Sequence, residues 1–485
     1  MDSQQLLVEH LDNSCYIITI SNIANEQCRI LYDHPGHSLQ SYTGIDVILC
    51  SNAQSLNNLL RYVDIHQFTG LIYSTWCNLV YHRMFQLRFS VSSHHQLSKR
   101  HRTQYNDIAL QKQYIKRVIP VTYDQYIQYR YIIIKVNCSG YSAGSAYYSI
   151  ILNDTNVTRE HQSRIIINVL NSINVSKARY CKSIDMKYLK QSDIIIYNNA
   201  QLPNVITPSS MSVLTRHIQQ LIDAQNNNQS YYFIQLPLQS DNIIYDIIEY
   251  CTIYIQSKHS NIPVILIGDH ASTILNYTTY ITEYCNVVKQ NRAIRHNYIT
   301  DIDKSKGLAE PFNYQYMIQQ KRLFIVDSIN HLPTISHQSS IYVTIEPTSD
   351  ATADIYNMLT QRASVQPHVL LLADTVYQSL DTMHLTPSNT VSVIQCPINP
   401  ALNINETQQL ITHCKPNDII CFNTDAQTQY RTFDCDLVDV MLNTDQLRQI
   451  QQVYPSTQQS VVVDVHCEYS ELHKDNLIHL DVSVR

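Results

Sequence analysis

The sequence predicts an α/β protein in which one α/β domain is split by a second, inserted α/β domain and is followed by a small α+β tail. Short apolar runs recur along the chain as buried strands do, and helical segments lie among the later ones. The pattern changes to a longer alternation of strand and helix near Thr207. A chain of 485 residues is also too long to fold around a single hydrophobic core, and this length suggests about two to four domains.

The first domain is predicted from eight short apolar segments. They are CYIITI (15–20), CRILY (28–32), DVILC (46–50), GLIYST (70–75), YIIIKV (131–136), AYYSIIL (146–152), RIIINVL (164–170) and DIIIYN (193–198). The first few are spaced as hairpins, and the later ones sit among helical segments. This order favours an α/β sandwich.

The inserted domain is predicted from helices alternating with central strands. The helices are VLTRHIQQLIDAQ (213–225) and YDIIEYCTIYIQS (245–257), and the strands are YYFIQLPL (231–238) and IPVILIG (262–268). Residues 286–321 are polar and weakly periodic, so we expect an irregular connection there.

A second set of strands follows the insert, with helices between them. They are RLFIVDS (322–328), SIYVTIE (340–346), HVLLLAD (368–374), VSVIQC (391–396) and DIICFN (418–423). The tail carries a helical segment at 444–453 and alternating strands at 461–465 and 477–483. The expected boundaries are 14–204 for the first part of the split domain, 205–330 for the insert, 331–425 for the return segment and 426–485 for the tail.

Composition excludes several functions. A net charge of −6 with 15% charged residues argues against tight, sequence-independent binding of nucleic acid by the whole chain. Only 7 glycines are present, and SGYSAGSA (139–146) lacks the spacing of a phosphate-binding loop.

The 13 cysteines form no C-x-x-C pair, so we expect buried thiols in a reducing compartment, with a disulfide framework or a zinc site as the alternatives. The N-terminal residues lack the features of a signal peptide, and no apolar run approaches about 18 residues, so we expect a soluble intracellular protein.

The segment VILCSNAQSLNNLLRYV (47–63) predicts a buried strand, a polar turn and a helix. Such strand-end loops usually hold the chemistry of α/β proteins. This one offers Asn52, Gln54 and Asn57, none of which titrates near neutral pH. It is either a binding loop of amides or the remains of a catalytic loop.

Several segments resemble the metallo-β-lactamase fold with an inserted β-CASP domain. DVILCSNAQSLNNLL followed by FTGLIYSTW resembles the strand, metal-binding loop, helix and G-x-IY-x-T strand of that family. SGYSAGSAYYSII resembles its A-G-H segment, and SDIIIYNNAQLP with CPINPALNINETQQLITHCKPNDIICFN resembles its segments on either side of the insert. The resemblance covers residues 15–425 in order, although no single motif is intact. It implies an αββα sandwich with a β-CASP insert.

Active members of that family use H-x-H-x-D-H and later His and Asp residues to hold two cations that activate water. The matching positions here carry residues that are weak ligands or none, namely Asn52, Gln54, Leu56, Asn57, Tyr141, Ala401, Asn403 and Asn423. The segment NVSKARYCKS (174–183), where the bridging Asp should lie, has no acidic residue. Asp33 matches the acidic residue beneath the metal loop, with an expected structural role in hydrogen-bonding turn amides. The resemblance therefore implies a pseudo-enzyme with no metal and no cofactor.

Two inactive branches of the family are known, and the chain resembles the one found in the Integrator complex more than the one found in the cleavage and polyadenylation specificity factor. The segments that carry this resemblance are DVILCSN, QFTGLIYST, SGYSAGSAYY and CPINPALNINETQQLI. This implies a nuclear protein, cytoplasmic before assembly, that pairs with the catalytic β-CASP nuclease, Integrator subunit 11, and with other Integrator subunits. The implied role is 3′-end processing of small nuclear RNA and attenuation of RNA polymerase II transcription. One alternative is the inactive large subunit of the cleavage and polyadenylation specificity factor, which acts on messenger RNA ends. Another is an active metal-dependent hydrolase that uses other histidines.

Three groups of residues invite a functional interpretation but have a simpler one. His34 and His37 have a spacing that suits a metal, yet a polar surface turn explains them. Asp269 and His270 follow a strand, where a helix-capping turn is the simpler explanation. Lys99, Arg100 and Arg102 lie in the most basic run, HHQLSKRHR (94–102). A solvated loop is the simpler explanation there, and an RNA-contacting or nuclear-import segment is the alternative.

Overall fold

The computed structural model gives a mixed α/β fold. It describes residues 4–11, 15–22, 26–34, 44–62, 68–92, 115–153, 164–177, 179–198, 211–224, 231–236, 243–258, 262–268, 271–299, 311–312, 314–326, 340–345, 368–372, 391–396, 402, 404–422 and 459–465. Within these residues the strands form three sheets. The α/β class predicted from the alternation of strands and helices is confirmed.

The first sheet has the strand order β19-β1-β2-β3-β4-β5-β6. Its strands are β1 (Gln4–His10), β2 (Tyr16–Ser21), β3 (Gln27–Tyr32), β4 (Val47–Leu49), β5 (Leu71–Thr75), β6 (Val118–Val121) and β19 (Gln459–Val465). The strands from β1 to β3 are antiparallel neighbours, whereas those from β3 to β6 are parallel. The carboxyl ends of β3, β4 and β5 therefore lie at one edge of the sheet, where a site is expected.

The second sheet has the order β18-β11-β10-β9-β8-β7. Its strands are β7 (Tyr126–Tyr129), β8 (Ile132–Cys138), β9 (Ala146–Asn153), β10 (Arg164–Leu170), β11 (Ile194–Asn198) and β18 (Asp418–Phe422). The strand β18 pairs in parallel with β11 although the inserted domain separates the two in sequence. The chain thus leaves this sheet at β11 and returns to it at β18.

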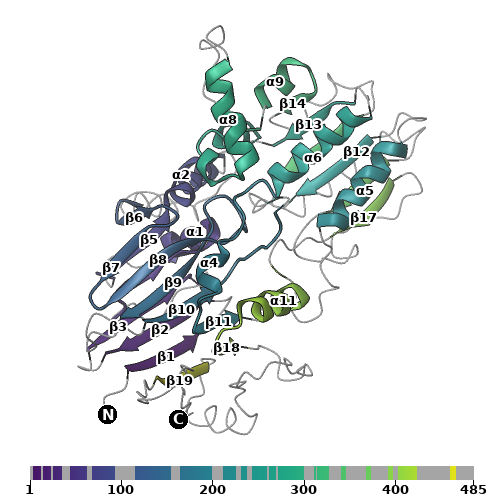
Figure 1. The fold of residues 1–485 in the computed structure, drawn as a ribbon. Coiled ribbons are helices and arrows are strands. Elements are labelled where there is room, and N and C mark those ends of the chain that lie inside the picture. The colour runs from purple at the N-terminus through teal and green to yellow at the C-terminus, as the bar shows by residue number, and fades with distance from the viewer. Residues whose placement is uncertain are drawn as a thin grey trace, which may run out of the picture.

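The two sheets pack face to face between two layers of helices (Figure 1). Alternating side chains explain this packing, because Ile30 lies in the core between the sheets and Leu31 lies on the outer face, against helix α1 (Ala53–Tyr62). The helix α2 (Trp76–Ser92) contributes Leu79 to the same outer core. Across the second sheet, the outer core contains residues of the helices α4 (Met186–Leu189) and α11 (Ile404–Cys414).

The inserted domain has one parallel sheet with the order β14-β13-β15-β12-β16-β17. Its strands are β12 (Tyr231–Leu236), β13 (Val264–Ile267), β14 (Leu323–Val326), β15 (Ser340–Ile345), β16 (His368–Leu372) and β17 (Val391–Gln395). Its helices are α5 (Met211–Ala224), α6 (Ile244–Ser257), α7 (Ala271–Tyr277), α8 (Val287–Ile299) and α9 (Tyr314–Gln319). Figure 1 shows this domain beyond the end of the sandwich that carries α2.

The structure differs from the sequence prediction in three places. Residues 286–321 contain the helices α8 and α9 rather than only an irregular connection. The strands β15, β16 and β17 pair within the insert's sheet, so the insert extends well past the expected boundary at 330. The segment 459–465, expected in a separate tail, pairs antiparallel with β1 at the edge of the first sheet, and β1 itself precedes the expected start at 14. The tail segments 444–453 and 477–483 lie outside the described residues.

The insert and the sandwich share one hydrophobic core. It joins Cys77 and Tyr81 of α2 to Tyr245 of α6 and Tyr277 of α7. The Tyr277 hydroxyl donates a hydrogen bond to the carbonyl oxygen of Cys77 at 3.1 Å. Because apolar side chains from both parts fill this core, separating them would expose apolar surface to water. No helix within the described residues is long and apolar enough to cross a membrane.

Candidate functional site

A polar pocket of about 320 Å³ opens at the edge where β3, β4 and β10 end. It is lined by Cys15, Asp33, His34, Asn52, Ala53, Gln54, Ser55, Asn58, Tyr81, Tyr141, Ser142, Asn171 and Ser172. Amides and hydroxyls therefore dominate the lining. The loop predicted to carry the chemistry of this fold contributes Asn52 and Gln54 to it.

Asp33, directly after β3, is a buried residue of the pocket lining. Its carboxylate accepts hydrogen bonds from the Ser51 backbone N–H at 2.6 Å, the Ser51 hydroxyl at 2.6 Å and the Asn171 amide at 2.5 Å. Burial raises the pKa of Asp33 above its ordinary value, and the hydrogen bonds from Ser51 oppose that shift. The carboxylate thus ties the ends of β3, β4 and β10 together.

Asn52 caps the first turn of α1. Its side-chain oxygen accepts from the Ser55 backbone N–H at 2.8 Å, which satisfies one of the unpaired donors at the helix start. Its Nδ2 donates to the hydroxyls of Ser172 at 2.9 Å and of Ser51 at 3.0 Å. Both ends of this amide are occupied by contacts within the protein.

The other residues of the predicted loop lie in three different surroundings. Gln54 faces the pocket and donates to Oδ1 of Asn58 at 3.0 Å. Leu56 is fully buried in the core under the first sheet, away from the pocket lining. Asn57 accepts a hydrogen bond from Nδ1 of His82 on α2 at 2.6 Å. Burial, with a smaller contribution from Arg83, lowers the pKa of His82 to about 4, so this imidazole is neutral at neutral pH.

The loop between β8 and β9 contributes Tyr141 and Ser142 to the lining. Gly140 and Gly144 have positive φ values of 73° and 86°. A Cβ atom at Gly140 would lie 2.2 Å from the Asn174 carbonyl oxygen, and one at Gly144 would lie 2.5 Å from Cβ of Cys77. Glycine is therefore required at these two positions, both by the positive φ and by the close approach of Asn174 and Cys77.

His34 was expected in a polar surface turn, and this was wrong. The residue is buried and lines the pocket, because the chain turns inward after Asp33, where φ is 58°. Several other residues singled out in the sequence lie outside the described residues, namely His37, Lys99, Arg100, Arg102, Asp269, His270, Ala401, Asn403 and Asn423.

The pocket offers little to a metal ion. Its lining contains Cys15, Asp33 and His34 as ligand-type side chains. Among the described residues, however, no three or more His, Cys, Asp or Glu side chains are placed to hold one ion together. The carboxylate of Asp33 is also directed to Ser51 and Asn171. The arrangement is suited to neutral polar contacts and to holding strand ends together.

Several residues in and around the site were missed by the sequence prediction. Asn171 and Ser172 follow β10 directly, and two polar residues at the carboxyl end of a buried strand were the available signal. His82 lies inside a mainly apolar helix, and nothing in the local sequence indicates its partner Asn57.

No protein-family model and no curated protein matches this chain.

Proposed function

We propose that this chain is a non-catalytic member of the metallo-β-lactamase/β-CASP family. The support is architectural and chemical. Two facing sheets lie between helical layers, and a domain with a parallel sheet is inserted between neighbouring strands, β11 and β18. The polar pocket lies at the strand ends where the sequence resemblance places the metal-binding loop.

The surroundings of the loop residues beside the pocket are the observation that carries the proposal. Asn52 caps a helix, Leu56 is part of a core and Asn57 bonds to a buried histidine. These three positions match metal ligands in active relatives. Since amide oxygens are weak ligands and an aliphatic side chain is none, a two-metal site would lose most of its ligands here.

The proposed role is that of an inactive partner for a catalytic paralogue. A retained fold offers the surface that a homologous chain recognises, as in pseudo-symmetric dimers. On the sequence resemblance, the chain corresponds to Integrator complex subunit 9, and its partner is the nuclease subunit 11. The function is then 3′-end processing of small nuclear RNA and attenuation of RNA polymerase II transcription in the nucleus.

The non-catalytic part of the proposal is tested by metal content and hydrolysis. The purified full chain is loaded with zinc, desalted and measured for bound zinc and for cleavage of a phosphodiester substrate, beside a catalytic paralogue treated identically. We expect fewer than about 0.1 zinc ions per chain and no cleavage, because the ligand set is degenerate. Stoichiometric zinc that is lost in His34→Ala, His37→Ala or His270→Ala, together with cleavage, would overturn the proposal.

A further inference from the structure

Two buried cysteines face each other where the sandwich meets the insert. Cys181 follows β10 and Cys285 precedes α8, and they pair in a short antiparallel bridge. Their neighbours make the hydrogen bonds: the N–H of Lys182 donates to the Tyr284 carbonyl at 2.8 Å, and the N–H of Asn286 donates to the Tyr180 carbonyl at 2.9 Å. The two cysteines are therefore the non-hydrogen-bonded pair of this bridge.

This register brings the two residues close together. The Cα atoms of a non-hydrogen-bonded antiparallel pair lie about 4.5 Å apart, and both side chains point to the same face. Disulfides join residues whose Cα atoms are about 4.4 to 6.8 Å apart. Cys181 and Cys285 are 2% and 0% exposed and belong to the same core. A sulfur–sulfur bond can thus form without moving the backbone apart.

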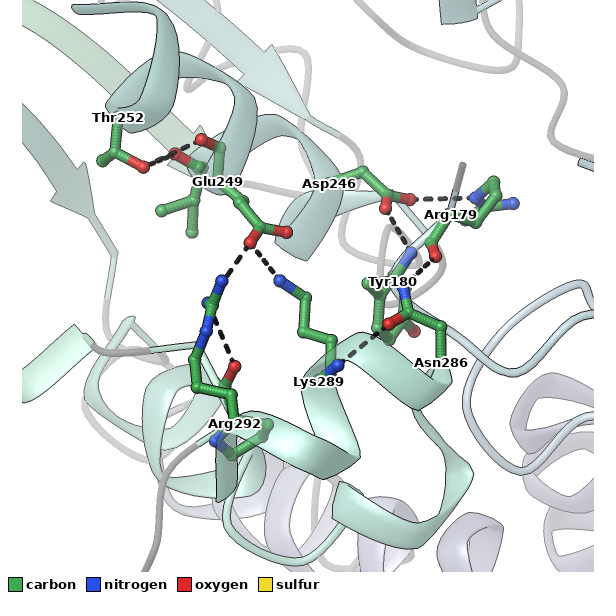
Figure 2. A network of polar contacts seen from close by, with 10 residues as sticks. Arg179, Tyr180, Asp246, Glu249, Thr252, Asn286, Lys289 and Arg292 are labelled. Carbon is green, nitrogen blue, oxygen red and sulfur yellow. Dashed lines mark hydrogen bonds and ion pairs between the residues drawn. The ribbon is translucent and has the colours of Figure 1, made fainter. Parts of the chain in front are cut away.

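The surrounding contacts hold this register from both sides (Figure 2). Asp246 of α6 accepts from Nε of Arg179 at 2.9 Å and from the Tyr180 N–H at 2.7 Å. The side chain of Asn286 donates to the Arg179 carbonyl at 2.7 Å and accepts from the Lys289 N–H at 3.0 Å. Figure 2 also shows Glu249 of α6 paired with Lys289 and Arg292 of α8. Both short segments are therefore fastened to α6.

Nearby cysteines have other contacts. The Cys77 thiol lies 3.0 Å from the Tyr277 hydroxyl, and the Cys138 thiol donates to the Lys182 carbonyl at 3.2 Å. In the reduced protein the Cys181 thiol itself donates to the Gly140 carbonyl at 3.1 Å, and oxidation would remove this hydrogen bond. Because no group of three or more potential ligands is placed to hold a metal among the described residues, the facing pair fits a disulfide better than a metal site.

In the reduced protein both thiols are protected. Burial raises the pKa of Cys181 to about 12 and raises that of Cys285 well above its ordinary value. The thiolate is the reactive form, so exchange is slow while the contact stays closed. Cross-linking therefore depends on transient opening of the contact between the insert and the sandwich.

We propose that Cys181 and Cys285 form a reversible disulfide that locks the insert against the sandwich under oxidising conditions. The oxidant is a low-molecular-weight disulfide such as oxidised glutathione. One cysteine loses its proton and attacks this disulfide, which releases one reduced glutathione and leaves a mixed disulfide. The second cysteine loses its proton and attacks the protein sulfur of that intermediate, which releases the second reduced glutathione. Two S–H bonds are replaced by one S–S bond, and one glutathione disulfide is reduced.

The effect of the bond follows from its place in the chain. It closes a loop of about 100 residues that contains the first strands and helices of the insert, and a loop of that size restricts the unfolded chain strongly. The cross-link does not depend on the proposed function, because it uses residues outside the polar pocket.

The test is a redox titration of the full chain with oxidised glutathione. Remaining thiols are alkylated, and the protein is digested and mapped by mass spectrometry without reduction. We expect a peptide pair linking Cys181 to Cys285. We also expect the midpoint of thermal unfolding to rise by about 5 °C, and dithiothreitol to reverse this rise. The disulfide should form faster in Arg179→Met, because this substitution loosens the contact between the insert and the sandwich. Cys181→Ala and Cys285→Ala should lose the linked peptide and the shift, whereas Cys77→Ala, in the same core, should keep both.

Two outcomes would overturn the proposal. One is that, after treatment with excess oxidised glutathione, both cysteines are still free thiols that can be alkylated once the protein is denatured. The other is a linkage of Cys181 or Cys285 to a different cysteine, such as Cys77 or Cys138. Both are measured on the wild-type chain, so they remain decisive if a variant fails to fold.

Discussion

Asp33 shows how a residue at a candidate site can serve the fold. Its buried carboxylate receives three hydrogen bonds, and its backbone has a φ of 58°. In Asp33→Ala the donors of Ser51 and Asn171 would lose their acceptor, and Ala would occupy the left-handed region. We expect the free energy of unfolding to fall by about 3 kcal/mol, measured by urea unfolding.

The matched control for Asp33→Ala is Lys321→Ala. Lys321 also has a positive φ, of 55°, but its side chain is exposed. This substitution keeps a non-glycine residue at positive φ and removes no buried hydrogen-bond acceptor, so we expect a change of less than about 0.5 kcal/mol. Equal losses in the two variants would contradict a structural role for the Asp33 carboxylate.

His82 should make stability depend on pH. Its pKa is about 4 in the folded chain and 6.5 in a model peptide, so the unfolded chain takes up the proton first as the pH falls. The wild type should therefore lose about 3 kcal/mol more stability than His82→Gln between pH 7 and pH 4. Urea unfolding at a series of pH values measures this, with exposed His413→Gln as the control. Parallel curves for the wild type and His82→Gln would be the contradicting result.

The candidate site was partly predictable at this scale. The sequence placed a polar loop after β4, because a buried strand followed by amides is a local pattern. It did not show that Leu56 turns into the core or that Asn57 meets His82, since both depend on how α1 and α2 pack. Contacts between distant segments are not encoded in local spacing.

At the level of single elements, the return strand β18 begins with a buried carboxyl group, that of Asp418. Asp418 is buried, its Oδ2 has no hydrogen-bond partner within the described structure, and burial together with Asp193 raises its pKa to about 6. Its ordinary pKa is 3.8, so the folded chain holds a proton there between about pH 6 and pH 4, and stability rises as the pH falls through that window.

Asp418→Asn should remove this cost. Because the amide is neutral, we expect the variant to be about 2 kcal/mol more stable than the wild type at pH 8, with the difference vanishing near pH 4. Thermal unfolding at the two pH values is the measurement. Asp223→Asn, at an exposed position on α5, should show no such gain. A stability gain in Asp418→Asn that is the same at both pH values would refute the explanation.

Most strands were predictable, whereas α8 was not. Apolar strands such as β4 and β13 are short continuous runs, which a sequence shows directly. In α8 the pattern is inverted, because Val287, Val288 and Ile294 are exposed while Lys289 is buried against Glu249. The buried face of that helix is defined by an ion pair with α6, so hydrophobic periodicity could not reveal it.

At the scale of the whole molecule, the shared core should make the insert and the sandwich unfold together. Tyr277 packs against Tyr81 of α2 and Tyr245 of α6, and it is buried. We expect Tyr277→Ala to destabilise both parts by about 3 to 5 kcal/mol. Hydrogen exchange on peptides from β9 and α6 should rise together, whereas Tyr316→Ala, at an exposed position of α9, should change neither. Faster exchange confined to the insert would show that the two parts unfold independently.

On the proposed function, this chain acts by pairing with a catalytic paralogue. The most direct measurement is affinity purification of the full chain from its own nuclei, followed by mass spectrometry of the proteins that remain bound. We expect recovery of a β-CASP nuclease with an intact H-x-H-x-D-H motif, together with other Integrator subunits. Recovery of polyadenylation factors would contradict the assignment to Integrator, and recovery of no β-CASP partner would contradict the pairing itself.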